Sequence, residues 1–264
     1  MNAASVLPRR WALWTTPPAE GVINMATDLA LLESVRTDQA VWRWYGWSSP
    51  TVSFGRNERV AGRYTADRLD AVGLTAVRRP TGGRALLHAR EITYSVTLPW
   101  SADRPWRTAY DAVNRLLTET LRRAGIPVER APASPAVRPD GPVCFDQPAE
   151  GELVLRGRKL VGSAVWRQGD AYLQHGSILL ADEQHRLVEA AQVPTLPAPP
   201  AATLAEAVPH RTPAAHLAAL QDALGLVLAD DGVTCSAFLP SPALAQAVAR
   251  EVRAQQDPGW VWRR

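Results

Sequence analysis

The chain has 264 residues, of which 46% are hydrophobic and 21% charged, and its net charge at pH 7 is +3. A chain of this size can bury one large core, and its composition argues against extensive disorder. It has no apolar run long enough to span a membrane, no secretory signal at its N-terminus, and too few cysteines for a disulfide framework. We therefore expect a reduced, cytoplasmic protein. The mild positive charge, without a basic block interleaved with aromatics, argues against nucleic acid as a partner.

Hydrophobic periodicity predicts alternating helices and strands in the first half of the chain. The segment 91–98 alternates Ile92, Tyr94 and Val96 with small polar residues, so we expect a strand with one buried face. Further on, ELVL, RKLVGSAVWR and AYLQHGSILL are separated by short Gly-containing turns, which predicts a three-stranded antiparallel meander over 152–180. The expected elements before this meander are a helix over 22–36, strands over 41–47, 51–55, 74–80 and 91–98, and a helix over 108–125.

The composition changes after residue 192. Residues 193–213 are a Pro/Ala-rich connector that we expect to be extended. Residues 214–264 form a small C-terminal α+β segment, expected to pack on the core. The overall fold class is predicted to be α+β, with residues 10–192 as the main domain.

The C-terminal segment is predicted to contain two helices, over 214–229 and 241–256, with a short strand between them. Ser241 is placed as the N-cap of the second helix and Pro242 as its first residue, which suits the fixed φ of proline. Cys235 lies in the short strand and is expected to be buried and inert.

A glycine pair marks the first motif that suggests chemistry. The segment RRPTGGRALLH begins at Arg78 and places Gly82 and Gly83 after a predicted strand. Glycines allow a backbone to approach a ligand closely, and Arg79 and Arg84 beside them offer donors for a carboxylate or phosphate. An ordinary turn with solvated arginines explains the spacing equally well. The segment is neither a P-loop nor a dinucleotide-binding motif.

The second motif pairs a cysteine with a lysine. Cys144 lies in a loop with prolines and acidic residues, and Lys159 heads the second strand of the meander. A nearby cation favours the nucleophilic thiolate, and alternation would place Lys159, Val161 and Ser163 on one face of the strand. The lysine would then point at a substrate carbonyl or lie at the sheet edge in solvent. A single cysteine is more often a small buried hydrophobe, so the residues alone leave both interpretations open.

Two histidines, His88 and His175, lie near these motifs in the sequence and are candidate bases. The sequence alone does not show whether either of them lies next to Cys144. The two distant cysteines and scattered histidines lack the spacing of a metal site, so no metal is expected.

Taken together, these motifs resemble the lipoate–biotin protein ligase and acyltransferase superfamily. NMATDLALLE resembles its N-terminal helix, and RRPTGGRALLHAREITYS resembles its glycine-rich lipoyl-binding loop and the following strand. GRKLVGSAVWR and LQHGSILL resemble its lysine strand and the partner strand. The resemblance runs in order and spacing from about residue 10 to residue 190. It implies a central mixed or antiparallel sheet flanked by helices, with residues 10–192 as the acyltransferase core.

Within this superfamily, VCFDQPAEGELVLRGRKLVGSA is similar to the cysteine-dependent octanoyltransferases of lipoate assembly. These enzymes move octanoate from acyl carrier protein to a lysine of a lipoyl domain, such as glycine-cleavage H protein or a dehydrogenase E2. The resemblance implies that Cys144 is the acyl-thioester nucleophile, that Lys159 acts at the acyl carbonyl, and that no cofactor is needed. The substrate-binding residues it implies are Arg79, Gly82, Gly83, Arg84, His88, Gly162, Ser163 and His175.

Two alternatives stay open. An ATP-dependent lipoate or biotin ligase would need a nucleotide-binding loop and no cysteine, although TGGR looks closer to the transferases, since the ligases tend toward a third glycine. A non-catalytic relative would only bind acyl carriers or lipoyl domains. The chain also departs from the transferase pattern at Ala89, where an acidic residue is common, and at Val165–Trp166, which replaces a more polar pair.

Overall fold

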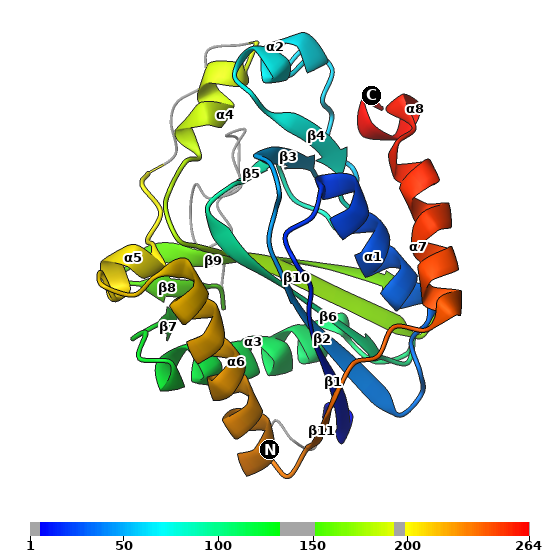
Figure 1. The fold of residues 1–264 in the computed structure, drawn as a ribbon, viewed down its shortest axis with the longest axis vertical. Helices are drawn as coiled ribbons and strands as arrows, with labels where there is room; N and C mark the ends of the chain where they lie inside the picture. The colour runs from blue at the N-terminus through cyan, green and yellow to red at the C-terminus, as the bar shows by residue number, and fades with distance from the viewer. Residues whose placement is uncertain (1–5, 133–150, 193–198, 264) are drawn as a thin grey trace.

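The computed structural model describes residues 6–132, 151–192 and 199–263. In this part of the chain, eight strands form one large mixed sheet in the order β11-β1-β2-β6-β10-β9-β8-β7, and β4-β3-β5 form a small second sheet (Figure 1). The strands are β1 (Arg10–Thr15), β2 (Gln39–Tyr45), β3 (Thr51–Phe54), β4 (Thr75–Arg78), β5 (Leu86–His88), β6 (Glu91–Pro99), β7 (Glu129–Arg130), β8 (Leu153–Leu155), β9 (Arg158–Gln168), β10 (Ala171–Leu179) and β11 (Thr234–Ala237). The helices are α1 (Gly21–Glu33), α2 (Ala66–Ala71), α3 (Trp106–Arg123), α4 (His185–Ala190), α5 (Leu204–Ala207), α6 (Pro213–Asp230), α7 (Pro242–Gln255) and α8 (Pro258–Val261).

The large sheet is antiparallel from β2 to β7, and parallel where β1 joins β2 and β11. Helices α3 and α6 pack on one face, and α1, backed by α7, packs on the other (Figure 1). Neighbouring side chains of β10 therefore meet different helices, because Gln174 bonds to Asn114 of α3 while His175 bonds to Asp28 of α1. The predicted α+β class and its central sheet flanked by helices are confirmed.

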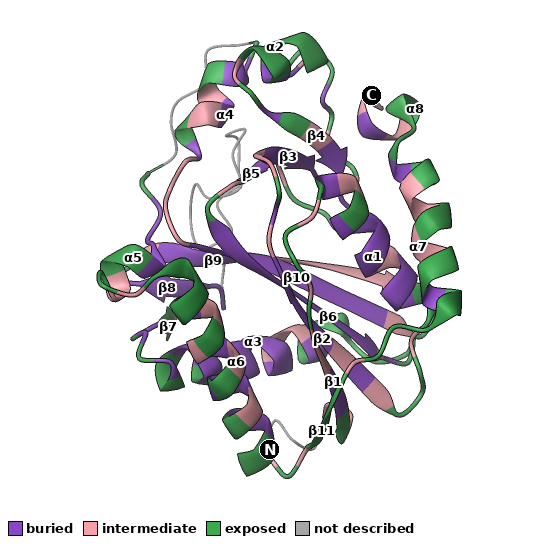
Figure 2. Ribbon diagram, viewed as in Figure 1, coloured by how far each residue is buried: buried purple, intermediate pink, exposed green. Residues whose placement is uncertain are grey.

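Coverage of both faces corrects the expectation for β6. Eight of its nine residues are buried, and only Pro99 at its end is half-buried. The small polar residues Thr93, Ser95 and Thr97 face α1 rather than solvent, and each is at most 2% exposed. Figure 2 shows this burial along the central strands of the sheet. The alternation of apolar and polar residues in β6 therefore marks a strand whose polar face lies inside the protein, against α1.

The small sheet packs at one end of the molecule with α2, α4 and α8 (Figure 1). Buried Arg78 at the end of β4 joins this end to the C-terminus, because its guanidinium donates to the carbonyls of Gly55, Glu58 and Trp260. The turn after β3 is therefore held close to the glycine-containing loop, residues 79–85, which follows Arg78 and leads to β5.

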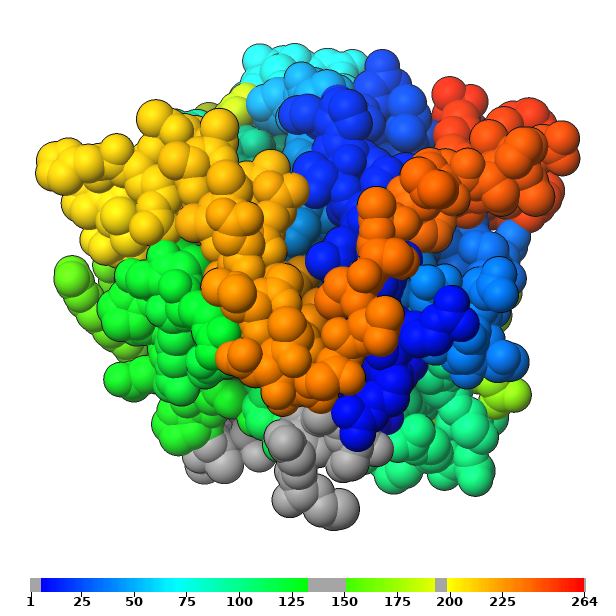
Figure 3. All heavy atoms as spheres, turned by 60° about the horizontal axis from the view of Figure 1, so that its bottom comes forward, coloured from blue at the N-terminus to red at the C-terminus, as the bar shows by residue number. Residues whose placement is uncertain are grey.

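The C-terminal segment contributes to several layers. Strand β11 pairs with β1, α6 packs on α3, and α7 packs on α1; Figure 3 shows this segment beside the N-terminal strand. Ser241 caps α7 as predicted, accepting from the Leu244 N–H, with Pro242 at the first position. The expectation of a buried Cys235 is wrong, because β11 is an edge strand whose four residues are exposed. The connector over 193–213 is also not extended throughout, since α5 forms within it and has Thr203 as its N-cap.

Candidate functional site

A pocket lies where α1, the glycine-containing loop and strands β5, β6, β9 and β10 converge. Five of the predicted substrate-binding residues line it: Arg79, His88, Gly162, Ser163 and His175. The other lining residues are Met25, Tyr45, Leu86, Thr93, Ala164, Gly176 and Ser177. The pocket thus combines an apolar wall with a small number of polar groups, as small-molecule sites usually do.

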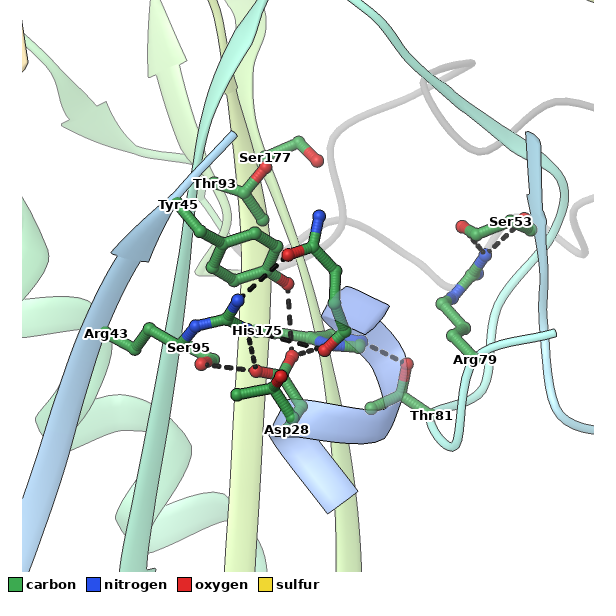
Figure 4. Close-up of polar contacts among 12 residues, drawn as sticks. Asp28, Arg43, Tyr45, Ser53, Arg79, Thr81, Thr93, Ser95, His175 and Ser177 are labelled. Carbon is green, nitrogen blue, oxygen red and sulfur yellow. Dashed lines mark hydrogen bonds and ion pairs between the residues drawn. The ribbon is translucent and has the colours of Figure 1, made fainter. Parts of the chain in front are cut away.

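On one side of the pocket, the fully buried carboxylate of Asp28 accepts four hydrogen bonds (Figure 4). The donors are Arg43 Nη1 at 2.9 Å, Tyr45 Oη at 3.0 Å, Ser95 Oγ at 2.8 Å and His175 Nδ1 at 3.1 Å. Burial alone would raise the pKa of Asp28, but the hydrogen bond from His175 and the charge of Arg43 outweigh it, so the pKa lies below its ordinary value. Asp28 is therefore a carboxylate balanced by the Arg43 guanidinium.

The His175 imidazole is neutral in this setting. Burial lowers its pKa, and the opposing influence of Asp28 does not reverse that direction. Because Nδ1–H donates to Asp28, Nε2 is the unprotonated nitrogen, and it lies 2.7 Å from the hydroxyl of Thr81. The threonine hydroxyl therefore donates to Nε2.

A second buried carboxylate, Glu91, lies beyond the pocket wall. Its Oε1 accepts from His88 Nδ1 at 2.9 Å, Thr93 Oγ1 at 2.6 Å, Ser177 Oγ at 2.7 Å and Trp47 Nε1 at 3.1 Å. Burial would raise the pKa of Glu91, but the charge and hydrogen bond of His88 hold it below its usual value. The His88 ring also stacks on Trp47, with ring centroids 3.9 Å apart.

Arg79 links this cluster to the glycine-containing loop. His88 Nε2 lies 2.7 Å from Ser53 Oγ, which accepts from Arg79 Nη1 at 2.9 Å. Both nitrogens of His88, like both of His175, are therefore hydrogen-bonded within the protein. This geometry favours the two histidines as walls of the pocket over a role as bases.

The backbone of the loop is held by Arg79 from within and by Glu58 from the turn after β3. Arg79 donates to the carbonyls of Gly82 and Arg84 at 2.9 and 2.8 Å, and Glu58 accepts from the N–H groups of Gly55 and Ala85. Gly82, Gly83 and Arg84, which the sequence predicts as substrate-binding residues, are not among the residues that line the pocket. The close approach of Gly83 also requires glycine at position 55, where a Cβ would lie 1.8 Å from the Gly83 carbonyl oxygen.

Lys159 is buried rather than solvated, and its Nζ lies 2.9 Å from Glu152 Oε1. The pairing with β8 contains a bulge: Val161 is opposite Leu153 and Lys159 is opposite Val154, so one residue of β9 is extra. Leu160 and Val161 consequently both enter the core under α3 and α6. The expected alternation of Lys159 with Val161 is thus broken, a re-aiming of side chains that bulges commonly produce. Lys159 does not line the pocket in the described part of the chain.

Ser163 connects the pocket to the other face of the sheet. Its Oγ lies 2.7 Å from Tyr94 Oη, which accepts from Gln174 Nε2 at 2.9 Å. The same amide nitrogen donates to Asn114 of α3, whose own amide donates to the carbonyl of Gly151. Cys144 lies outside the described residues, so the structure does not place the predicted nucleophile.

Sequence reasoning missed Asp28, Arg43, Tyr45 and Glu91. The signal for two of them was available: Asp28 interrupts an apolar helix and Arg43 an apolar strand, and buried charges are seldom unpaired. Their pairing could not be read from the sequence, because nothing local connects the two segments.

The chain is similar in sequence to known octanoyltransferases. The octanoyltransferase LipM of Kyrpidia tusciae is 33% identical over 263 residues, covering 94% of this chain and 89% of that protein. The octanoyltransferase LipM of Exiguobacterium sibiricum is 36% identical over 193 residues, covering 69% of this chain and 70% of that protein. The corresponding protein of Staphylococcus aureus is 39% identical over 180 residues, covering 64% of this chain and 65% of its own length.

Solved structures share the fold. A putative lipoate protein ligase from Thermoplasma acidophilum with bound lipoic acid superposes with a TM-score of 0.77 at 17% identity, covering 97% of this chain and all of that one. Lipoate-protein ligase A bound with ATP gives a TM-score of 0.76 at 17% identity, covering 96% of this chain and 98% of that one. The family profile described as the lipoyl protein ligase A/B catalytic domain matches residues 20–223. The chain therefore belongs to the lipoyl protein ligase A/B catalytic domain family.

Proposed function

We propose that this protein is an octanoyltransferase of lipoate assembly. The observation that carries the proposal is the likeness to an octanoyltransferase at 33% identity over 94% of the chain. The pocket supports it, because its apolar wall, which includes Met25 and Leu86, suits an acyl chain. Each methylene buried there would contribute about 0.8 kcal/mol of binding free energy.

The donor in this proposal is octanoyl-acyl carrier protein and the acceptor is a lysine of a lipoyl domain, such as glycine-cleavage H protein or a dehydrogenase E2. The Cys144 thiolate attacks the thioester carbonyl, and the bond from that carbon to the carrier sulfur breaks. The acceptor amine then attacks the new thioester, the C–N bond forms, the amine loses a proton, and Cys144 leaves as a thiolate. No adenylate is needed, because a thioester is already activated.

Lys159 is proposed to stabilise the negative oxygen that each attack creates. An ammonium and backbone N–H groups can do this, each contributing about 3–4 kcal/mol in comparable sites. The buried Glu152 carboxylate, 2.9 Å from Nζ, forms an ion pair that holds the lysine side chain in place. The reaction is proposed to take place in the cytoplasm, where the thiol stays reduced. No helix in the described residues is both long and apolar enough to cross a membrane.

ATP-dependent ligation is the weaker candidate. The relatives quoted above at more than 30% identity are octanoyltransferases, whereas the ATP-bound structure is only 17% identical and shares the fold alone. Pyrophosphate release from ATP and free lipoate, unaffected by Cys144→Ser, would favour that candidate.

Intact-mass analysis tests the proposal. Incubation with octanoyl-acyl carrier protein should add one octanoyl group that hydroxylamine removes, and Cys144→Ala should abolish the adduct. Lys159 is the only lysine in the sequence, so an amide-linked adduct could lie only there or at an N-terminal amine. Transfer from the acyl-enzyme to an apo-lipoyl domain without ATP completes the test. Absence of an adduct, or its survival in Cys144→Ala, would overturn the proposal.

A further inference from the structure

A line of hydrogen bonds runs beside the pocket from α1 to the glycine-containing loop. Asp28 on α1 accepts from Nδ1 of His175, and Nε2 of the same ring lies 2.7 Å from the Thr81 hydroxyl (Figure 4). His175 lies on β10 and lines the pocket, so one imidazole joins a helix, a strand and a loop. All three residues are buried, at 0, 6 and 0% exposure for Asp28, His175 and Thr81.

The donors around Asp28 determine the direction of these hydrogen bonds. The carboxylate is surrounded by donors from β2 and β6 as well as His175, namely Arg43, Tyr45 and Ser95. It therefore takes the Nδ1 proton and leaves Nε2 as a lone-pair acceptor. A ring with the opposite tautomer would have no proton to donate to Asp28, so the cluster selects the form that can hold a hydroxyl.

Thr81 is well placed to transmit this constraint to the backbone. Its carbonyl accepts from the Arg56 N–H at 2.8 Å, and Gly82 and Gly83 follow it directly. The contacts made by Arg79 to Ser53 and by Glu58 to Ala85 tie the loop to β3 and its turn, in the small sheet. The bond from Thr81 to His175 joins the loop to the large sheet instead, beside the pocket that Arg79 and His175 line.

We propose that His175 is a positioning residue, whose Nε2 holds the Thr81 hydroxyl and so fixes the Gly82–Gly83 turn against the acyl pocket, with Asp28 selecting the required tautomer. The inference rests on the proposed octanoyl transfer for its kinetic consequence, but not for the structural one. The His175 imidazole then has a positioning role and not one in proton transfer.

Two substitutions separate the hydroxyl from the volume of the side chain. Thr81→Val keeps the shape and removes the donor, whereas Thr81→Ser keeps the donor. For the octanoyl donor, Thr81→Val should raise KM about tenfold with a smaller change in kcat, because one buried hydrogen bond that orders the site is lost. Thr81→Ser should stay within about twofold of the wild type. Thr120→Val is the control, since its buried hydroxyl donates to Leu116 within α3, away from the pocket.

Hydrogen exchange supplies a readout that does not depend on activity. The amides of Arg56 and Ala85, which bond to the Thr81 carbonyl and to Glu58, should exchange about tenfold faster in Thr81→Val, but not in Thr81→Ser or Thr120→Val. Unchanged exchange in Thr81→Val would overturn the positioning role, as would equal effects of valine and serine. Faster exchange with an unchanged KM would overturn the link to the site. If the wild type transfers no octanoyl group, the proposed function fails while exchange still decides the positioning role.

Discussion

The two faces of the large sheet are buried to a similar extent, yet they hold different chemistry. Under α3 and α6 the sheet presents Trp42, Tyr94 and Val96, which pack into one apolar cluster. Under α1 the neighbouring residues of the same strands, Arg43 and Ser95, belong to a network of buried charges and hydroxyls. Burial alone therefore does not distinguish a structural face from a functional one. The two faces differ in whether they bury charged groups. Removing charged groups from water rarely adds net stability to a fold.

Removing the central charge should have the largest effect. Asp28→Asn leaves the Arg43 guanidinium, 1% exposed, without the carboxylate that lies 2.9 Å from it. Breaking a buried ion pair in this way typically costs about 3–5 kcal/mol of unfolding free energy. Urea denaturation of the variant and the wild type measures the loss. A loss below about 1 kcal/mol would mean that the site tolerates an unpaired guanidinium, and that the charged face is less demanding than its burial suggests.

The apolar face should respond to a cavity with a loss of stability alone. Leu117 of α3 is fully buried in the cluster that includes Trp42 and Tyr94. Leu117→Ala should lower the unfolding free energy by about 3 kcal/mol through lost burial and the cavity left behind. KM for the octanoyl donor should not change in the folded variant. A changed KM in the folded variant would show that the two faces are not independent.

The sequence was sufficient for elements that carry their own signals. Helix α7 has Ser241 and Pro242 at its start, and the meander of β8, β9 and β10 has glycine-containing turns, so both were predicted correctly. Strand β1 was not predicted, although it pairs with both β2 and β11, because parallel pairing joins distant segments without a turn between them. The bulge beside Lys159 was also missed, since an extra residue in one strand has no composition signature.

The same limit applies to the site. The Gly82–Gly83 loop and His88 are predicted from motifs, and His88 lines the pocket. Asp28 and His175 are 147 positions apart in the chain, and only the packing of α1 on β10 brings them together. The polar alternation in β6 predicts a strand with one buried face, because the sequence does not say that a second layer covers the other face. Sequence thus indicated the pocket's loops better than its buried charges.

A histidine on each face offers a contrast that pH can reveal. His216 of α6 is 1% exposed, and neither of its nitrogens has a hydrogen-bond partner among the described residues, whereas both nitrogens of His175 are bonded. Burial lowers the pKa of His216, and the charge of Arg211 adds to this. Below the ordinary histidine pKa of about 6.5, the unfolded chain gains a proton that the folded chain does not. The unfolding free energy therefore decreases as the pH is lowered, until the pH reaches the lower pKa of the folded state.

His216→Leu should remove this dependence. The variant should be about 1 kcal/mol more stable at neutral pH, because two unsatisfied nitrogens are replaced by an apolar side chain of similar size. Its unfolding free energy should also decline less than that of the wild type as pH falls from 7 toward 5. Urea denaturation at several pH values gives the difference between the two proteins. Parallel curves would show that His216 contributes no linked proton.

The smallest effect is expected where the same chemical change is made at the surface. Asp38 pairs with Arg10 at 2.6 Å, but the two side chains are 47 and 60% exposed, so water and salt screen the pair. Asp38→Asn should cost no more than about 0.5 kcal/mol, and the cost should vanish in concentrated salt. Compared with Asp28→Asn, it changes the same atoms on a residue that also faces an arginine. Similar losses of unfolding free energy at the two sites would mean that burial does not determine how much a carboxylate contributes to stability here. The contrast between the buried charged face and an ordinary surface ion pair would then no longer hold.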